Sequence, residues 1–283
     1  MNRDFLNQFF ATWGIFLDKK LPELIHDPDQ ELPSYEDETP ELARAMTPLV
    51  GAVLGIAVYI PVWLLYRLFG PVPSALAAGL LGPFLIEYLS GWHGLAALTD
   101  YIVMRRNGAT QEEALLHGDD EENGGRGGGG DNGEELTMLR PSSMILFLSL
   151  YLLRVGAFAA LAAFDASFWI VIALTGGYLV RAELASIVER GTQTPLLEAP
   201  ERFARWHWYT ALAAMLIFSL GNIWYIPCVI LALGMIWLIA WYCSHLCLDT
   251  ISGMTPRAVE IFGYASELVL LLLGLLLWTG GGK

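Results

Sequence analysis

The chain has 283 residues, of which 55% are hydrophobic, and its mean hydropathy is +0.48. A soluble core does not need so much apolar sequence, so the composition favours a membrane protein. The formal net charge is −13, but much of it comes from two segments, 23–41 with eight acids and 112–135 with nine. We expect both acidic segments to be solvated, and they argue against nucleic acid as a partner.

The first predicted element is a helix within residues 5–17. This stretch is apolar in patches, is interrupted by Asn7, Gln8 and Gly14, and is followed by Lys19 and Lys20. No small-residue cleavage site follows it, so we do not interpret it as a signal peptide. Its aromatic face and the two lysines predict a helix in the membrane interface, with an amphipathic soluble helix as the alternative. Residues 1–42 thus form an N-terminal helix and acidic segment.

A polytopic all-α membrane bundle is predicted for the rest of the chain, residues 43–283. A spanning helix needs about 20 mostly apolar residues. Seven stretches are counted as spans: 47–69, 73–98, 143–164, 168–186, 208–221, 226–246 and 259–278. The loop at 107–137 contains the Gly-rich run 124–133 and is predicted to be a mobile acidic insertion.

The distribution of basic residues predicts the orientation of the bundle. If the N-terminus lies inside, nearly all Lys and Arg in the loops are cytoplasmic, and only Arg67 and Lys283 fall outside. An excess of Lys and Arg marks the cytoplasmic side. We therefore expect an integral protein of the inner (cytoplasmic) membrane with a cytoplasmic N-terminus.

Ionisable side chains inside the predicted spans are the candidates for function, because charges at membrane depth are costly. They are Glu87, His93, Asp100, Arg154, Arg181, Glu183, His245, Asp249, Glu260 and Glu267. His93 and Asp100 are two helical turns apart and share a helix face. We expect His93, Asp100, Arg181 and Glu267 to meet in one polar pocket at the cytoplasmic helix ends. The set Cys243, His245 and Cys247 is interpreted as packing, because no second Cys/His pair completes a metal site.

Several short motifs follow one another along the spans in a fixed order. They are Pro48-Leu49-Val50-Gly51 with Gly55, His93-Gly94-Leu95-Ala96 with Asp100, Arg140-Pro141-Ser142, Arg181, and Gly253-Met254-Thr255 with Glu267. In order and spacing this series, over roughly residues 44–273, resembles the cobalamin synthase family, the adenosylcobinamide-GDP ribazoletransferases. The resemblance implies a helical membrane protein of that family.

The chain departs from the family at acidic positions. The family's Asp-Gly-Leu-Ala-Asp-x-x-Asp, thought to hold magnesium, reads here with His93 and Ala97 in place of the first two acids and retains Asp100. Pro141 and Arg257 stand where the family has further acids. A magnesium site of hard oxygen ligands would therefore lack several of them.

The resemblance also implies an activity and roles for residues. The protein would join α-ribazole (or its phosphate) to adenosylcobinamide-GDP and release GMP. The implied residues are His93 and Asp100 for catalysis, Asp100 and Glu267 for Mg²⁺, and Arg140, Ser142, Arg181, Thr255 and Arg257 for substrate. The expected partners are corrinoid and nucleotide substrates and membrane lipid, with a homo-oligomer also considered.

Two other classes of function stay open. A catalytically impaired paralogue would keep the fold and bind a corrinoid, a lipid or a protein partner. A small transporter would use the intramembrane charges to line a pathway. Turnover, binding without turnover, and flux into liposomes distinguish the three.

Overall fold

The computed structural model describes residues 3–17, 42–116, 141–192, 194–197, 203–219 and 225–280. In these ranges the chain is helical and has no strand, which agrees with the predicted all-α class. Five helices are long and apolar enough to cross a membrane: α3 (Ala43–Phe69), α4 (Pro71–Leu89), α9 (Pro141–Ala163), α12 (Tyr225–Ile251) and α13 (Pro256–Gly280). α10 (Phe168–Leu184) and α11 (Trp206–Ser219) are shorter. The described chain thus gives a helical membrane bundle with five candidate spans, where seven were predicted.

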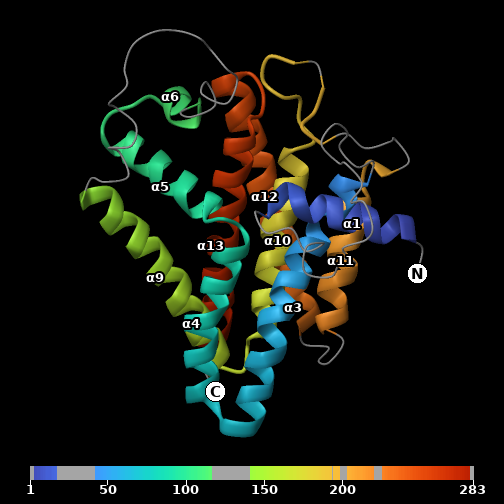
Figure 1. The fold of residues 1–283 in the computed structure, drawn as a ribbon, viewed down its shortest axis with the longest axis vertical. Helices are drawn as coiled ribbons and strands as arrows, with labels where there is room; N and C mark the ends of the chain where they lie inside the picture. The colour runs from blue at the N-terminus through green and yellow to red at the C-terminus, as the bar shows by residue number, and fades with distance from the viewer. Residues whose placement is uncertain are drawn as a thin grey trace, which may run out of the picture.

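Helix α10 is the centre of the bundle. All its residues except Glu183 are buried, and it packs against α3, α11, α12 and α13 (Figure 1). A helix that is apolar on every side is expected in such a central position. The glycines of the first motif allow the close approach of α3: a Cβ at Gly51 would lie 2.5 Å from the Leu174 carbonyl oxygen, and one at Gly55 2.6 Å from Val171 Cα. Small residues permit this contact between helices.

The predicted span 73–98 is two helices. α4 ends at Leu89, and α5 (His93–Arg106) begins after a turn in which Gly91 and Trp92 have φ values of 64° and 65°. The left-handed backbone cannot continue an α-helix, so the chain changes direction here (Figure 1). The Trp92 ring packs against Phe147 and Tyr151 of α9 and holds the turn in place. His93 is consequently the first residue of a new helix.

The N-terminal region begins with α1 (Arg3–Phe16), which lies across the bundle beside the start of α3 (Figure 1). Trp13 and Leu17 are buried, and Gln8 Oε1 accepts a hydrogen bond from the Leu42 N–H at 3.2 Å. The predicted acidic segment lies almost wholly outside the described residues. Part of the predicted loop 107–137 is ordered as α6 (Gln111–Leu116), and its Gly-rich run also lies outside the described residues.

Backbone hydrogen bonds join the segment after α10 to the start of α13. The Met254 N–H donates to the Val188 carbonyl at 3.0 Å, and the Arg190 N–H donates to the Met254 carbonyl at 2.9 Å. A Cβ at Gly253 would lie 2.8 Å from Arg190 Cα, so the motif glycine allows this approach. The end of α10 and the beginning of α13 therefore have a fixed relation to each other, and both border the pocket described below.

Candidate functional site

Five charged side chains from four helices form a continuous row, here called the charge ladder. In order of contact they are Glu87, Arg154, Glu267, Arg181 and Glu260. Arg154 of α9 pairs with Glu87 of α4, and its Nη2 lies 2.7 Å from Glu267 Oε2 on α13. Arg181 of α10 donates to the other Glu267 oxygen and, from Nε at 3.2 Å, to Glu260 Oε2. The ladder therefore connects α4, α9, α10 and α13.

Burial gives the charge ladder a high free-energy cost of desolvation. Arg154 and Glu87 are each 1% exposed in their side chains, whereas Glu260 at the other end is 27% exposed. Three carboxylates and two guanidiniums leave one net negative charge when all are ionised. Charges taken out of water are tolerated only when they are paired and hydrogen-bonded. Each charged group of the ladder has an oppositely charged partner, although the buried Arg154 Nε has no hydrogen-bond partner, and the ladder reaches solvent at Glu260.

Aromatic rings and glycines make room for the two arginines. The Arg154 guanidinium lies 4.9 Å from the centre of the Tyr264 ring, and that of Arg181 lies 4.6 Å from the Tyr178 ring. Aromatic faces attract cations, most strongly where water is absent. A Cβ at Gly177 would lie 2.1 Å from Glu267 Cγ, and one at Gly263 would lie 2.4 Å from Arg181 Cγ. The space for the charged side chains thus depends on glycine at both positions.

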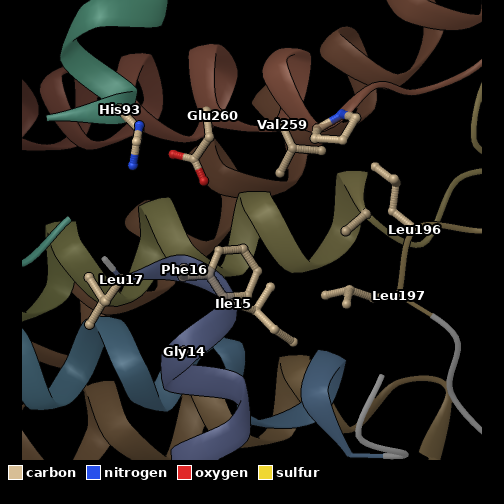
Figure 2. Close-up of a pocket in the computed structure, with 11 residues that line it drawn as sticks. Gly14, Ile15, Phe16, Leu17, His93, Leu196, Leu197, Val259 and Glu260 are labelled. Carbon is tan, nitrogen blue, oxygen red and sulfur yellow. The ribbon is translucent and has the colours of Figure 1, made fainter. Parts of the chain in front are cut away.

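A pocket of about 530 Å³ lies at the exposed end of the ladder. Eleven residues line it, on α1, α5 and α13 and in the segments directly after α1 and α10, and among them only His93 and Glu260 have polar side chains. The His93 ring and the Glu260 carboxylate share one wall, opposite the apolar side chains of α1 and of Leu196 and Leu197 (Figure 2). The size is in the range that holds one small organic molecule.

The predicted catalytic residues His93 and Asp100 both lie on α5, and they have different surroundings. His93 is exposed and borders the pocket, and the next residue, Gly94, packs closely on α13, where its Cβ would lie 3.4 Å from Glu260 Oε2. Asp100 is half-buried, and its Oδ2 lies 3.3 Å from Nη2 of Arg257 on α13. α5 therefore packs on α13 both at its start, beside the pocket, and at the Asp100–Arg257 pair.

The other predicted site residues are placed as follows. Arg181 and Glu267 are in direct contact in the charge ladder, which also reaches the pocket through Glu260. Thr255 is buried, and its Oγ1 accepts a hydrogen bond from the Ala258 N–H at 3.1 Å, as expected of the residue that caps a helix. Arg140 and the side chain of Ser142 lie outside the described residues. The substrate roles of all of these residues stay predictions.

The carboxylates as they lie do not fit a magnesium site. Each oxygen of Glu267 accepts a hydrogen bond from an arginine, and Asp100 is paired with Arg257. Within the described ranges no group of three or more His, Cys, Asp or Glu side chains is placed to hold a metal ion. Mg²⁺ takes several oxygen ligands in near-octahedral geometry. The binding of magnesium by Asp100 and Glu267 therefore stays a prediction.

A second polar cluster joins α10, α11 and α3. The buried His207 Nε2 lies 2.5 Å from Glu183 Oε2, which also accepts a hydrogen bond from Trp208 Nε1 at 3.1 Å. Arg44 lies 3.8 Å from the same carboxylate oxygen. This cluster anchors α11 to the centre of the bundle, and none of its members lines the pocket.

All five ladder residues are predicted intramembrane charges, but only Arg181 and Glu267 have predicted roles. The cost of a charge at membrane depth was the signal that also marked Glu87, Arg154 and Glu260. No pattern in the sequence pairs Arg154 with Glu87 and Glu267, which lie 67 and 113 residues away along the chain. The contribution of α1 to the pocket was likewise missed, because it depends on how that helix crosses the bundle.

The fold and the site together define a helical membrane protein with a pocket backed by buried ion pairs. No protein-family model, curated protein or solved structure matches the chain.

Proposed function

We propose that the protein is a membrane transferase of the cobalamin synthase type, which joins α-ribazole (or its phosphate) to adenosylcobinamide-GDP and releases GMP. One observation carries the proposal: α5 and α13, which hold the second and last motifs, border one pocket with His93 and Glu260 on its wall, and Arg181 of α10 contacts Glu260 directly. The motifs resemble the family in order and spacing, and this convergence supports a common site for them.

In the proposed reaction, the hydroxyl oxygen of α-ribazole forms a bond to the phosphorus attached to the corrinoid. The bond between that phosphorus and the GMP oxygen breaks, GMP leaves with the electron pair, and the hydroxyl proton passes to His93. His93 suits this role because its ring is exposed at the pocket. A base within reach of the attacking hydroxyl typically contributes 10²–10⁴-fold to the rate.

Phosphoryl transfer also needs positive charge around the phosphate groups. Arg257 is the candidate, because it directly follows the pocket residue Pro256 and its side chain is 18% exposed. The Asp100 carboxylate holds the guanidinium in place from α5. A positioned arginine can bind two phosphate oxygens at once. Asp100 would thus position a phosphate-binding group, a role distinct from the predicted metal ligand.

The membrane setting of the reaction is part of the proposal. We propose that the protein lies in the inner membrane with the N-terminus and the pocket on the cytoplasmic side, where the nucleotide substrate is present. The large excess of Lys and Arg in the loops on this side supports the orientation.

The test is an assay of the purified full-length protein in lipid nanodiscs. Adenosylcobinamide-GDP and α-ribazole are supplied with and without Mg²⁺, and cobalamin product and GMP are measured by chromatography. We expect product from the wild type, a 10²-fold or greater loss in His93→Ala, and a smaller loss in Asp100→Asn. Asp165→Asn, which alters a carboxylate paired with Arg67, is the control and should keep full activity. Absence of product under both conditions would refute the transferase.

A second function is favoured by one specific observation. The oxygens of Glu267 accept hydrogen bonds from arginines, and Asp100 is paired with Arg257, so the positions that resemble the family's metal ligands are occupied by ion pairs. This arrangement suits a catalytically impaired relative that binds a corrinoid, a lipid or a protein partner. Binding of a corrinoid without GMP release in the same assay would favour it.

A further inference from the structure

We propose that the buried end of the charge ladder is a binding site for one proton, so that Glu87 is a neutral carboxylic acid in the folded protein. The site lies at the opposite end of the ladder from the pocket, and the inference does not rest on the proposed transferase. It is carried by the charge balance of the ladder, by the hydrogen bonds of its carboxylates, and by an unpartnered polar side chain beside Glu87.

The charge balance of the ladder calls for a proton. Three carboxylates face two guanidiniums, so the ladder has one more acid than it can pair. The charged and titratable groups around Glu87 come from α9 and α13, and they are Arg154, Tyr151, Glu267 and Tyr264. Among these described neighbours Arg154 is the one cation, and it is shared with Glu267. Because an unbalanced charge at this depth is costly, a carboxylate there takes up a proton from water instead.

The hydrogen bonds of the three carboxylates indicate which of them holds the proton. Each oxygen of Glu267 accepts a hydrogen bond from an arginine, and a proton on either oxygen would put a donor where an acceptor is needed. The Glu260 side chain is 27% exposed, so water stabilises its charge. Glu87 is 1% exposed and is contacted by one guanidinium, through Oε1. Ionisation is therefore most costly at Glu87.

An acceptor for the bound proton lies beside Glu87. The Tyr264 hydroxyl is buried near the Glu87 carboxyl group and has no hydrogen-bond partner. The Tyr264 ring is held by the Arg154 guanidinium, which lies 4.9 Å from the ring centre. A carboxylic acid has one O–H donor, and a phenolic oxygen can accept from it. A proton on Glu87 Oε2 can thus be donated in a hydrogen bond to Tyr264 while Oε1 keeps its contact with Arg154.

The direct test is infrared spectroscopy of the full-length protein in dodecyl maltoside, a detergent without carbonyl groups, at neutral pH. A protonated carboxylic acid has a C=O stretching band that is separate from the amide and carboxylate bands and shifts in heavy water. We expect this band in the wild type and its loss in Glu87→Gln. Glutamine keeps the volume of the neutral acid and also has a donor and an acceptor.

A second variant tests whether the charge balance is the cause. Glu260→Gln keeps Glu87 but leaves two carboxylates and two guanidiniums, so Glu87 should become ionised and the band should disappear. Asp165→Asn is the matched control, because it alters a carboxylate outside the ladder, and it should keep the band. By the same balance, removal of an arginine raises the demand of the ladder by one proton.

The unfolding midpoint gives a measurement that does not depend on the infrared band. If Glu87 is neutral, Glu87→Gln should unfold in mixed detergent micelles at the wild-type midpoint, and a clear fall would overturn the inference. It would also be overturned by a wild type without the band, by a band that remains in Glu87→Gln, or by a band that Glu260→Gln leaves unchanged. None of these measurements involves turnover, so a negative transfer assay would refute the transferase alone.

Discussion

The charge ladder and the Arg67–Asp165 pair contain the same chemical groups in opposite settings. Arg154 is 1% exposed and lies between two buried carboxylates, whereas Arg67 and Asp165 are 56% and 37% exposed in their side chains and lie 3.5 Å apart. A buried charge that loses its partner costs several kcal/mol, but an exposed pair contributes between 0 and about 1 kcal/mol. Removal of chemically similar ion pairs should therefore change the unfolding free energy of this protein by very different amounts, and the following predictions measure that difference.

The largest effect is expected from removal of Arg154. Arg154→Met leaves Glu87 without its arginine and Glu267 with only one, so we expect a loss of about 3–5 kcal/mol in unfolding free energy. The measurement is reversible unfolding in mixed detergent micelles, followed by circular dichroism.

A second variant tests whether charge is the cause of this loss. Arg154→Met combined with Glu87→Leu returns the site to one excess negative charge and should recover at least half of the lost stability. If the double variant is no more stable than Arg154→Met, the loss reflects packing, and the contrast between buried and exposed pairs would be wrong.

Gly177→Ala should have the next largest effect. The new methyl group would lie 2.1 Å from Glu267 Cγ, and the backbone of the buried α10 cannot easily move away. Overpacking of this kind typically costs 1–3 kcal/mol. Gly234→Ala on α12 is the matched control, because a Cβ there meets nothing within 4 Å. Similar unfolding free energies for the two variants would contradict the close contact between α10 and α13.

Arg67→Ala should have a small effect. Both partners of this pair are well exposed, so we expect a loss of less than about 1 kcal/mol in the same unfolding measurement. A loss as large as that of Arg154→Met would show that exposure does not govern the strength of ion pairs in this protein.

The smallest effect concerns pH and the start of α6. The Thr110 N–H donates to Glu113 Oε2 at 2.7 Å, the Glu113 N–H donates to Thr110 Oγ1 at 3.2 Å, and the backbone hydrogen bond holds the pKa of Glu113 below its usual range. A lowered folded-state pKa means that the cap is fully present above the ordinary pKa of glutamate. It is lost as the pH falls through the lowered value. Hydrogen exchange of the α6 amides should show protection factors that decrease in this acidic range in the wild type and do not change with pH in Glu113→Gln.

Composition and periodicity were sufficient to predict the helical membrane class, because an apolar run of about 20 residues has the length that a spanning helix needs. They could not predict that residues 73–98 divide into two helices. The break lies at Gly91 and Trp92, and the left-handed conformation of Trp92 is accompanied by packing against Phe147 and Tyr151. A local sequence pattern does not predict long-range aromatic contacts of this kind.

The candidate site could be predicted from the sequence to a similar extent as the fold. The cost of intramembrane charge identified every member of the charge ladder, and helix spacing placed His93 and Asp100 on one helix. The partners could not be predicted, because a single sequence does not contain the rotations of α9, α10 and α13 about their axes. These rotations direct Arg154 and Arg181 to opposite oxygens of Glu267 and leave Glu260 as the member that lines the pocket.

The test measures GMP release by full-length Gly14→Phe and Gly156→Phe protein in nanodiscs, with adenosylcobinamide-GDP and α-ribazole supplied. It shows whether transfer takes place at the pocket. Gly14 lines the pocket and Gly156 does not, and a Cβ at either position meets nothing within 4 Å. If the pocket at the end of the charge ladder is the site of transfer, Gly14→Phe should lower the rate at least tenfold at subsaturating α-ribazole, and Gly156→Phe should match the wild type. Equal rates for the two variants would contradict this assignment, because the reaction would then take place away from the pocket.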